Sequence, residues 1–141
     1  MRLQLVTLDG VKFDKDVYQV ILPTATGAIA VFDNHEPLVT VAVPGVITIV
    51  DKAGDSAQVY EHFASEGGIV EIKSHELRIL VDEALHSSEI IEEESRKALE
   101  LAQKLKDEAK DRISLAHAQT LVDRETLRLK VAELRRHRRI K

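Results

Sequence analysis

The segment VYQVILPTATGAIAVFDNHEPLVTVAVPGVITIV, residues 17–50, decides the fold class. It holds four short runs rich in Val, Ile, Thr and Leu, separated by turn residues at Pro23, Asp33-Asn34 and Pro44-Gly45. β-Branched residues favour strands, whereas proline, glycine, asparagine and aspartate favour turns. The alternation therefore predicts four consecutive short strands.

The same pattern extends in both directions from this segment. Residues 3–7 form an apolar run that ends at Asp9-Gly10, a strong hairpin dipeptide. Further strands are expected at 57–63, 69–72 and 77–81. Many short strands about ten residues apart, with no helical pattern between them, are typical of an antiparallel sandwich or barrel. We expect a β-sandwich domain over residues 1–84.

Beyond Asp82 the composition changes. Residues 89–141 contain no glycine, proline or aromatic residue and are rich in the strong helix formers Ala, Leu, Glu, Lys and Arg. A single helix of that length would be about 80 Å long, so we expect a two-helix domain over residues 85–141, folded back as an antiparallel hairpin. The helix-forming composition is weakest at residues 111–117, which indicates the turn between the two helices. Ser114 could cap the second helix, and Ser87 or Ser88 could cap the first.

Composition and motifs also exclude several classes of function. The chain has no cysteine, no phosphate-binding loop and no zinc-type histidine spacing, so we expect no metal, no cofactor and no enzyme active site. Residues 1–88 carry 6 basic and 13 acidic side chains, and residues 89–141 carry 14 basic and 11 acidic ones. Two modules with different partners are therefore expected. The start of the chain turns polar too soon for a signal peptide, which favours a cytoplasmic protein.

Several short motifs follow one another in a fixed order over nearly the whole chain. The most specific is a strand that ends in proline, then a strand that begins with glycine, then a loop of the form His-x-Pro-Leu. The stretches concerned are Val6-Thr7-x-Asp9-Gly10, Leu22-Pro23-Thr24, Gly27-x-Ile29-Ala30-Val31, Asn34-His35-Glu36-Pro37-Leu38-Val39, Pro44-Gly45-Val46, Gly67-Gly68-Ile69-Val70-Glu71-Ile72, Leu77-x-Ile79-Leu80-Val81-Asp82-x-Ala84 and Arg128-Leu129-x-Val131-Ala132-Glu133-Leu134. In this order the motifs resemble those of the epsilon subunit of the F-type ATP synthase.

The resemblance implies a non-catalytic rotor-stalk subunit. About ten strands would dock on the gamma subunit and the ring of c subunits, and the helices would reach the alpha/beta hexamer and inhibit ATP hydrolysis. Such a subunit meets the membrane only through its complex, at the cytoplasmic face of a bacterial inner membrane or, as an alternative, the stromal face of a plastid thylakoid. The expected partner contacts are Asn34, His35, Glu36, Pro37, Leu38, Arg124, Arg128, Arg135, Arg136, Arg138 and Arg139.

One departure from the family concerns nucleotide binding. Some bacterial members bind ATP through Ile-Asp-x-x-Arg-Ala at the base of the helices, where this chain has Ile90-Ile91-Glu92-Glu93-Glu94-Ser95. Ile90, Arg124 and Arg128 match the family's site, but the acid is replaced by an isoleucine and the arginine by Glu94. A carboxylate repels phosphate, so we expect no ATP binding. A shifted alignment on Glu93 and Arg96 would restore part of the motif but misplaces the apolar positions that follow.

Two other classes of function remain as alternatives. A β scaffold that binds nucleic acid through the C-terminal arginines would suit the basic end of the chain. The chain is net acidic, however, with a formal charge of −4 and few aromatic residues for base stacking. The third alternative is a free-standing coiled-coil adaptor, but such a protein would not need the β domain.

Overall fold

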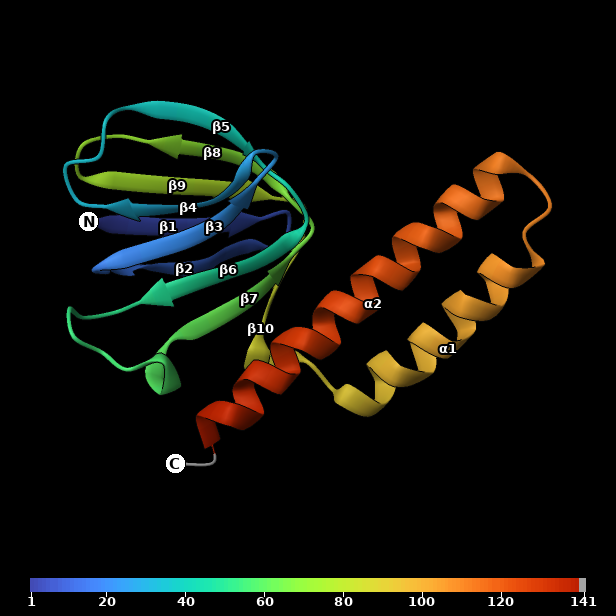
Figure 1. Ribbon diagram of the computed structural model, residues 1–141. Coiled ribbons are helices and arrows are strands. Elements are labelled where there is room, and N and C mark those ends of the chain that lie inside the picture. The colour runs from blue at the N-terminus through green and yellow to red at the C-terminus, as the bar shows by residue number, and fades with distance from the viewer. Residues whose placement is uncertain (140–141) are drawn as a thin grey trace.

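The computed structural model describes the backbone of residues 1–139 and the side chains of residues 1–135. A β domain is followed by two helices that project from one of its sides (Figure 1). Its strands are β1 (Arg2–Thr7), β2 (Gly10–Asp16), β3 (Gln19–Thr24), β4 (Gly27–Phe32), β5 (Leu38–Ala42), β6 (Gly45–Val50), β7 (Glu61–Ser65), β8 (Gly68–Ile72), β9 (Glu76–Val81) and β10 (Ala84–His86). The helices of the chain are the short 3-10 turns η1 (Ala57–Val59) and η2 (Ser87–Glu89) and the long α1 (Glu92–Glu108) and α2 (Arg112–Arg139).

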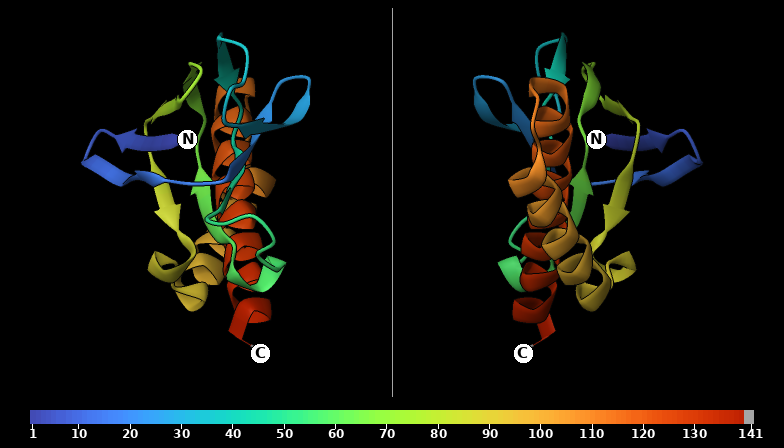
Figure 2. Two further views of the ribbon diagram at one scale, coloured as in Figure 1. Left: turned by 90° about the vertical axis from the view of Figure 1, so that its left-hand side faces the viewer. Right: turned by 90° about the vertical axis from the view of Figure 1, so that its right-hand side faces the viewer.

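The ten strands form two five-stranded sheets. One has the order β4-β3-β6-β7-β10, the other β5-β8-β9-β1-β2, and they join where Thr24 pairs with Ala42. Every strand pair is antiparallel except β1 with β9, which run parallel. In Figure 2 the helices lie behind the sandwich in the left view and in front of it in the right view. The predicted sandwich followed by a helical hairpin is confirmed.

Strict alternation along the strands builds the core of the sandwich. β9 buries Leu77, Ile79 and Val81 and leaves the residues between them exposed. β1 does the same with Leu3 and Leu5, which are wholly buried. Because side chains of a strand alternate between faces, each sheet contributes one apolar face to a shared interior.

Two strands and one boundary differ from the sequence prediction. The hairpin expected at Asp9-Gly10 implies a strand after it, but the sequence does not predict the range of β2, because its residues VKFDKD interleave charged and apolar side chains. The three-residue β10 is too short to leave a sequence pattern. Residues 57–59, predicted as the start of a strand, form η1 instead, and β7 begins at Glu61.

The Gly67-Gly68 pair marks a position that only glycine can occupy. Gly67 has φ +95°, a left-handed conformation that strains other residues. A Cβ on Gly68 would collide with the backbone carbonyl of Leu80 on the neighbouring strand. The pair thus lets the chain turn tightly into β8.

The helical hairpin is confirmed, but its turn and caps differ from those predicted. The chain leaves the helix at Ala109, before the expected 111–117 break. Asp111 caps α2, accepting hydrogen bonds from the Ser114 backbone N–H at 2.7 Å and hydroxyl at 3.1 Å, so Ser114 is not the cap. Ser87 begins η2, which His86 caps, and α1 starts later with no side-chain cap. None of the described helices is long and apolar enough to cross a membrane.

The C-terminal half of α2 lies on the outer face of the first sheet (Figure 1). On that face Val46, Ala64 and Leu85 form a row across β6, β7 and β10. Val131 and Ala132 of α2, both wholly buried, cover this row. The turn to α1 extends away from the sandwich (Figure 1). The apolar contact described here comes from the C-terminal half of α2.

We predict that the sandwich folds without the hairpin, as a fragment of residues 1–86. All five aromatic residues and the large buried cluster lie within it. The fragment must extend to His86 because β10 pairs with β7, and Ala84 is wholly buried. Thermal and denaturant unfolding should be cooperative. Non-cooperative unfolding with exposed apolar surface would contradict the prediction, and a fragment ending at Ala84 should be less stable than one ending at His86.

Candidate functional site

A row of apolar side chains crosses the outer face of the second sheet. Strand register places Val41, Ile69, Leu80, Val6 and Val11 side by side on β5, β8, β9, β1 and β2. Val41 is 60% exposed, Ile69 52% and Val11 61%. We call these five residues the exposed apolar row. A contiguous apolar surface of this kind marks an interaction site in a soluble protein.

The exposed apolar row was not predicted, because two features hide it in the sequence. Alternation suggests that Val11 and Phe13 share one face, but a bulge between Leu5 and Val6 shifts the register. Phe13 therefore packs toward the core while Val11 points outward. The second feature is that Ile69, Leu80 and Val6 each have an apolar neighbour in the sequence, so alternation does not show which side chain faces outward.

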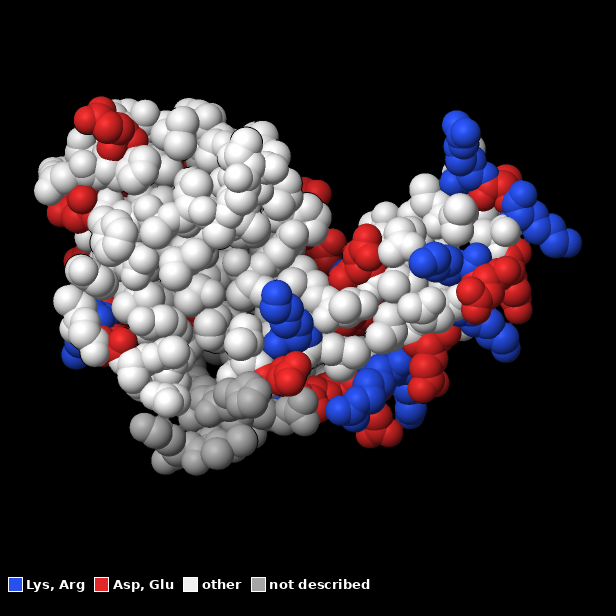
Figure 3. Space-filling view, in the orientation of Figure 1, with Lys and Arg blue, Asp and Glu red and all other residues white. Residues whose placement is uncertain are grey.

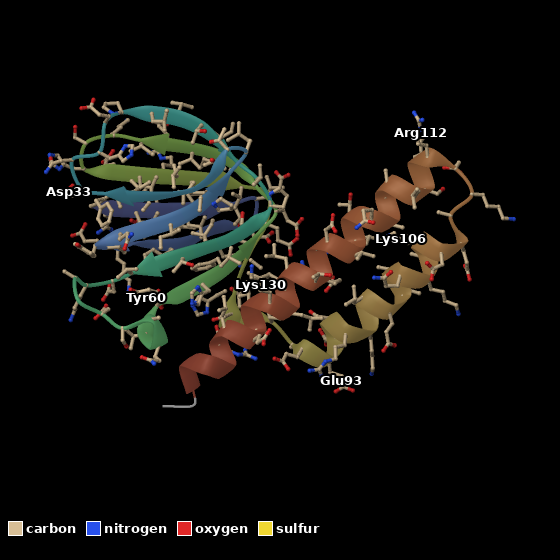
Figure 4. All side chains as sticks on the ribbon, viewed as in Figure 1. Asp33, Tyr60, Glu93, Lys106, Arg112 and Lys130 are labelled. Carbon is tan, nitrogen blue, oxygen red and sulfur yellow. The ribbon has the colours of Figure 1, made fainter. Side chains whose placement is uncertain are left out.

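The predicted contact loop lies at the end of the sandwich farthest from the hairpin, where Figure 4 labels Asp33. Asn34 adopts a left-handed φ of 63° and donates its backbone N–H to the Ser74 carbonyl at 2.6 Å. His75 donates to the Asp33 carboxylate at 2.9 Å, and this bond lowers the pKa of Asp33 below its usual value. His35 bonds the Glu36 carbonyl at 2.7 Å.

The five predicted loop residues are therefore presented on a braced turn. Asn34, Glu36, Pro37 and Leu38 are exposed, and His35 is half-buried. Braced polar loops at the end of a rigid scaffold are common contact surfaces. The structure keeps these five residues together on one loop.

A cluster of charged side chains fills the junction between the hairpin and the sandwich. The Arg128 guanidinium of α2 donates to Glu83, just before β10, at 2.7 Å, and to Glu125 at 3.2 Å. Arg124 pairs with the same Glu125 carboxylate at 3.2 Å. Glu125 is only 3% exposed, so its charge is compensated by two arginines away from water. We call Glu83, Arg124, Glu125 and Arg128 the junction cluster.

A further carboxylate, Glu66, borders the junction cluster. Burial raises the pKa of Glu66, the nearby Glu83 charge raises it further, and Arg128 and Arg124 partly offset these effects. An acid whose pKa is raised on folding costs stability when ionised. Its cost is therefore largest at neutral pH and is relieved as the pH falls through the weakly acidic range.

A cavity of about 210 Å³ opens where α1, α2 and β10 meet. Two of the three predicted nucleotide-site residues, Ile90 and Arg128, line it, whereas Arg124 does not. The cavity is smaller than the roughly 300–1,000 Å³ of typical ligand pockets. Glu89, Glu94 and Glu125 also line it. Its single arginine, Arg128, already binds two carboxylates, so the lining residues do not fit a nucleoside triphosphate.

The arginines predicted to contact a partner do not form one exposed surface in the docked hairpin. Arg124 and Arg128 belong to the junction cluster, and Arg135 donates to the Ser87 carbonyl at 2.8 Å. All three thus face the junction while the hairpin is docked. The side chains of Arg136, Arg138 and Arg139 lie outside the described residues. In Figure 3, basic and acidic side chains alternate over the projecting part of the hairpin, while the visible face of the sandwich is mostly uncharged.

Comparison with known proteins agrees with these features. Residues 1–87 match the family model described as ATP synthase, Delta/Epsilon chain, beta-sandwich domain. The chain is 33% identical over 138 residues to an ATP synthase epsilon chain of Herpetosiphon aurantiacus, with 98% of each chain covered. It is 31% identical over 139 residues to that of Chloroflexus aggregans, covering 99% of this chain and 96% of the relative.

Solved structures share the fold at lower sequence identity. A chain of the Euglena gracilis mitochondrial ATP synthase superimposes with a TM-score of 0.77 at 22% identity, covering 93% of this chain and 79% of that one. A chain from the Tetrahymena thermophila mitochondrial ATP synthase central stalk and c-ring gives 0.60 at 16%, covering 92% and 94%. The matched sandwich, the relatives of nearly equal length and the appended hairpin lead to one conclusion: the chain belongs to the ATP synthase epsilon chain family.

Proposed function

We propose that this chain is the central-stalk epsilon subunit of an F-type ATP synthase, an accessory subunit with no active site of its own. The observation that carries the proposal is similarity to epsilon chains over almost the full length of both proteins. In this role the sandwich holds the rotor together and the hairpin regulates ATP hydrolysis. We further infer a peripheral position at the cytoplasmic face of a bacterial inner membrane.

The exposed apolar row is the surface we assign to the gamma subunit. A rotor joint must stay closed under torque, and stable interfaces are built around a dehydrated apolar centre. The first sheet already has its outer row covered by α2, whereas Val41, Ile69 and Val11 on the second sheet are open. The Asn34–Leu38 loop, on the end of the sandwich away from the hairpin, is then free to meet the c-ring.

The hairpin is the part we assign to regulation. Its apolar contact with the sandwich comes from the C-terminal half of α2, and Arg128 and Arg135 are bonded at the junction while it is docked. Contact of Arg124, Arg128 and Arg135 with acidic surfaces of the alpha/beta hexamer therefore requires the hairpin to leave the sandwich. Inhibition would follow from that extended arrangement.

We predict that Ile69→Lys weakens gamma binding by at least about tenfold. Ile69 lies in the exposed apolar row between Val41 and Leu80, and burying an unpaired ammonium there would cost several kcal/mol. Because the side chain is exposed in the free subunit, stability should change by no more than about 0.5 kcal/mol. Titration of the purified gamma subunit measures the affinity. Ile113→Lys at the hairpin tip, where the residue is 84% exposed, is the matched control, and equal affinity for both variants would reject the surface.

Removing residues 88–141 should raise ATP hydrolysis by the assembled complex while leaving assembly and ATP synthesis intact. The sandwich keeps its gamma and c-ring surfaces, and the complex loses the cations that would contact the catalytic hexamer. Hydrolysis and synthesis by membrane vesicles that contain each form measure the effect. Equal hydrolysis rates with and without the hairpin, at low and high salt, would show that the helices only brace the sandwich.

ATP should not bind the isolated chain at millimolar concentration. The cavity at the base of the hairpin holds Glu94 in place of an arginine, and Arg128 is already paired. Isothermal titration calorimetry should show no binding heat. Ile91→Asp combined with Glu94→Arg should improve affinity, and a millimolar or tighter dissociation constant for the unaltered chain would refute the prediction.

A further inference from the structure

We propose that the junction cluster is a releasable ionic latch, in which Glu83 of the sandwich competes with the hairpin's external partner for the same arginine, Arg128. The bond between Glu83 and Arg128 then keeps the hairpin docked without any ligand. While this bond exists, Arg128 is not available for the contact that inhibits hydrolysis. The latch itself is a property of the isolated chain. Only its effect on hydrolysis rests on the proposed function.

The geometry at Arg128 carries the first step. The guanidinium uses one nitrogen for Glu125 on its own helix, at 3.2 Å, and the other for Glu83 on the sandwich, at 2.7 Å. The bond to Glu83 joins residues 45 positions apart in the chain. It is therefore a contact that exists only while α2 is docked, whereas the bond to Glu125 can persist in the free hairpin.

Exposure of the three side chains gives the second step. Glu125 is 3% exposed, Arg128 18% and Glu83 42%. A bond whose sandwich-side partner is partly hydrated costs little to exchange for water or for another carboxylate. A docking contact made only of apolar groups would lack this property. Glu83 therefore fastens the hairpin without making docking permanent.

Other contacts determine what release exposes. Arg135 donates to the Ser87 carbonyl at 2.8 Å, and Arg124 remains paired with Glu125. When α2 leaves the sandwich, Arg128 and Arg135 lose their partners Glu83 and Ser87 together. Two cations about two helical turns apart then become available to an acidic surface. Docking and inhibition use the same two arginines, Arg128 and Arg135, so a docked hairpin cannot inhibit and an inhibiting hairpin cannot be docked.

Distance measurement between spin labels on the full chain tests the latch. The chain has no cysteine, so Lys73→Cys on the sandwich and Lys110→Cys at the hairpin turn give unique label sites. In buffer without nucleotide, one docked distance should dominate. Glu83→Gln, which leaves the Arg128–Glu125 bond in place, should raise the ratio of undocked to docked molecules by about tenfold.

Two further variants decide whether the effect belongs to this one bond. Glu83→Gln combined with Arg128→Gln should undock no more than Arg128→Gln alone, because the second change finds no bond left to remove. Lys97→Gln is the control, since it removes a cation whose partner, Glu93, is on the same exposed helix surface. An unchanged distance for Glu83→Gln, additive effects in the double variant, or an equal shift for Lys97→Gln would each overturn the latch.

Hydrolysis by the assembled complex separates this inference from the proposed function. Glu83→Gln should lower the hydrolysis rate, since more hairpins are released to inhibit. If the labels show undocking in the isolated chain but hydrolysis stays the same, the latch stands and the inhibitory role of the hairpin fails. If the labels show no undocking, the latch fails whatever the hydrolysis rate.

Discussion

Strand β7 is packed on both of its faces, and this double burial joins the two parts of the molecule. Phe63 points into the sandwich, where it meets Phe13 edge to face with ring centroids 6.3 Å apart. The next residue, Ala64, points the other way and lies beneath Val131 and Ala132 of α2. Small side chains on both elements let the helix lie close to the sheet. The hairpin therefore rests on a strand that the sandwich itself holds rigid.

Around this apolar contact, polar groups set how strongly and how reversibly the hairpin is held. The apolar contact of Val131 and Ala132 with the first sheet is a hydrophobic attraction, which does not depend on direction. The bonds of Arg128 and Arg135 add direction, because they can form in one docked arrangement only. Burial and the neighbouring Glu83 raise the pKa of Glu66, and Arg128 and Arg124 of α2 partly offset this increase. The junction thus combines a stable contact with an adjustable one.

Much of this architecture can be predicted from the sequence, and the failures have physical causes. Turn residues such as Pro44-Gly45 and Gly67-Gly68 punctuate the strands clearly, and the glycine-free end of the chain indicates helices. β10 escapes notice because three residues carry no periodicity, and the bulge beside Val6 reverses which residues face outward. Arg128 is predicted as a surface cation, and only the fold reveals that Glu83 lies within reach of it.

The parallel pairing of β1 with β9 has a consequence for how the chain acquires its structure. Residues from the two ends of the sandwich, such as Leu3 and Leu77, must meet before the second sheet exists. Contacts between distant parts of a sequence slow folding, because a long loop must close first. During synthesis the first half of the sheet must wait, with unpaired edges, until β9 has left the ribosome. The helices then form quickly from local contacts, and the short β10 and the residues that follow guide them onto β7.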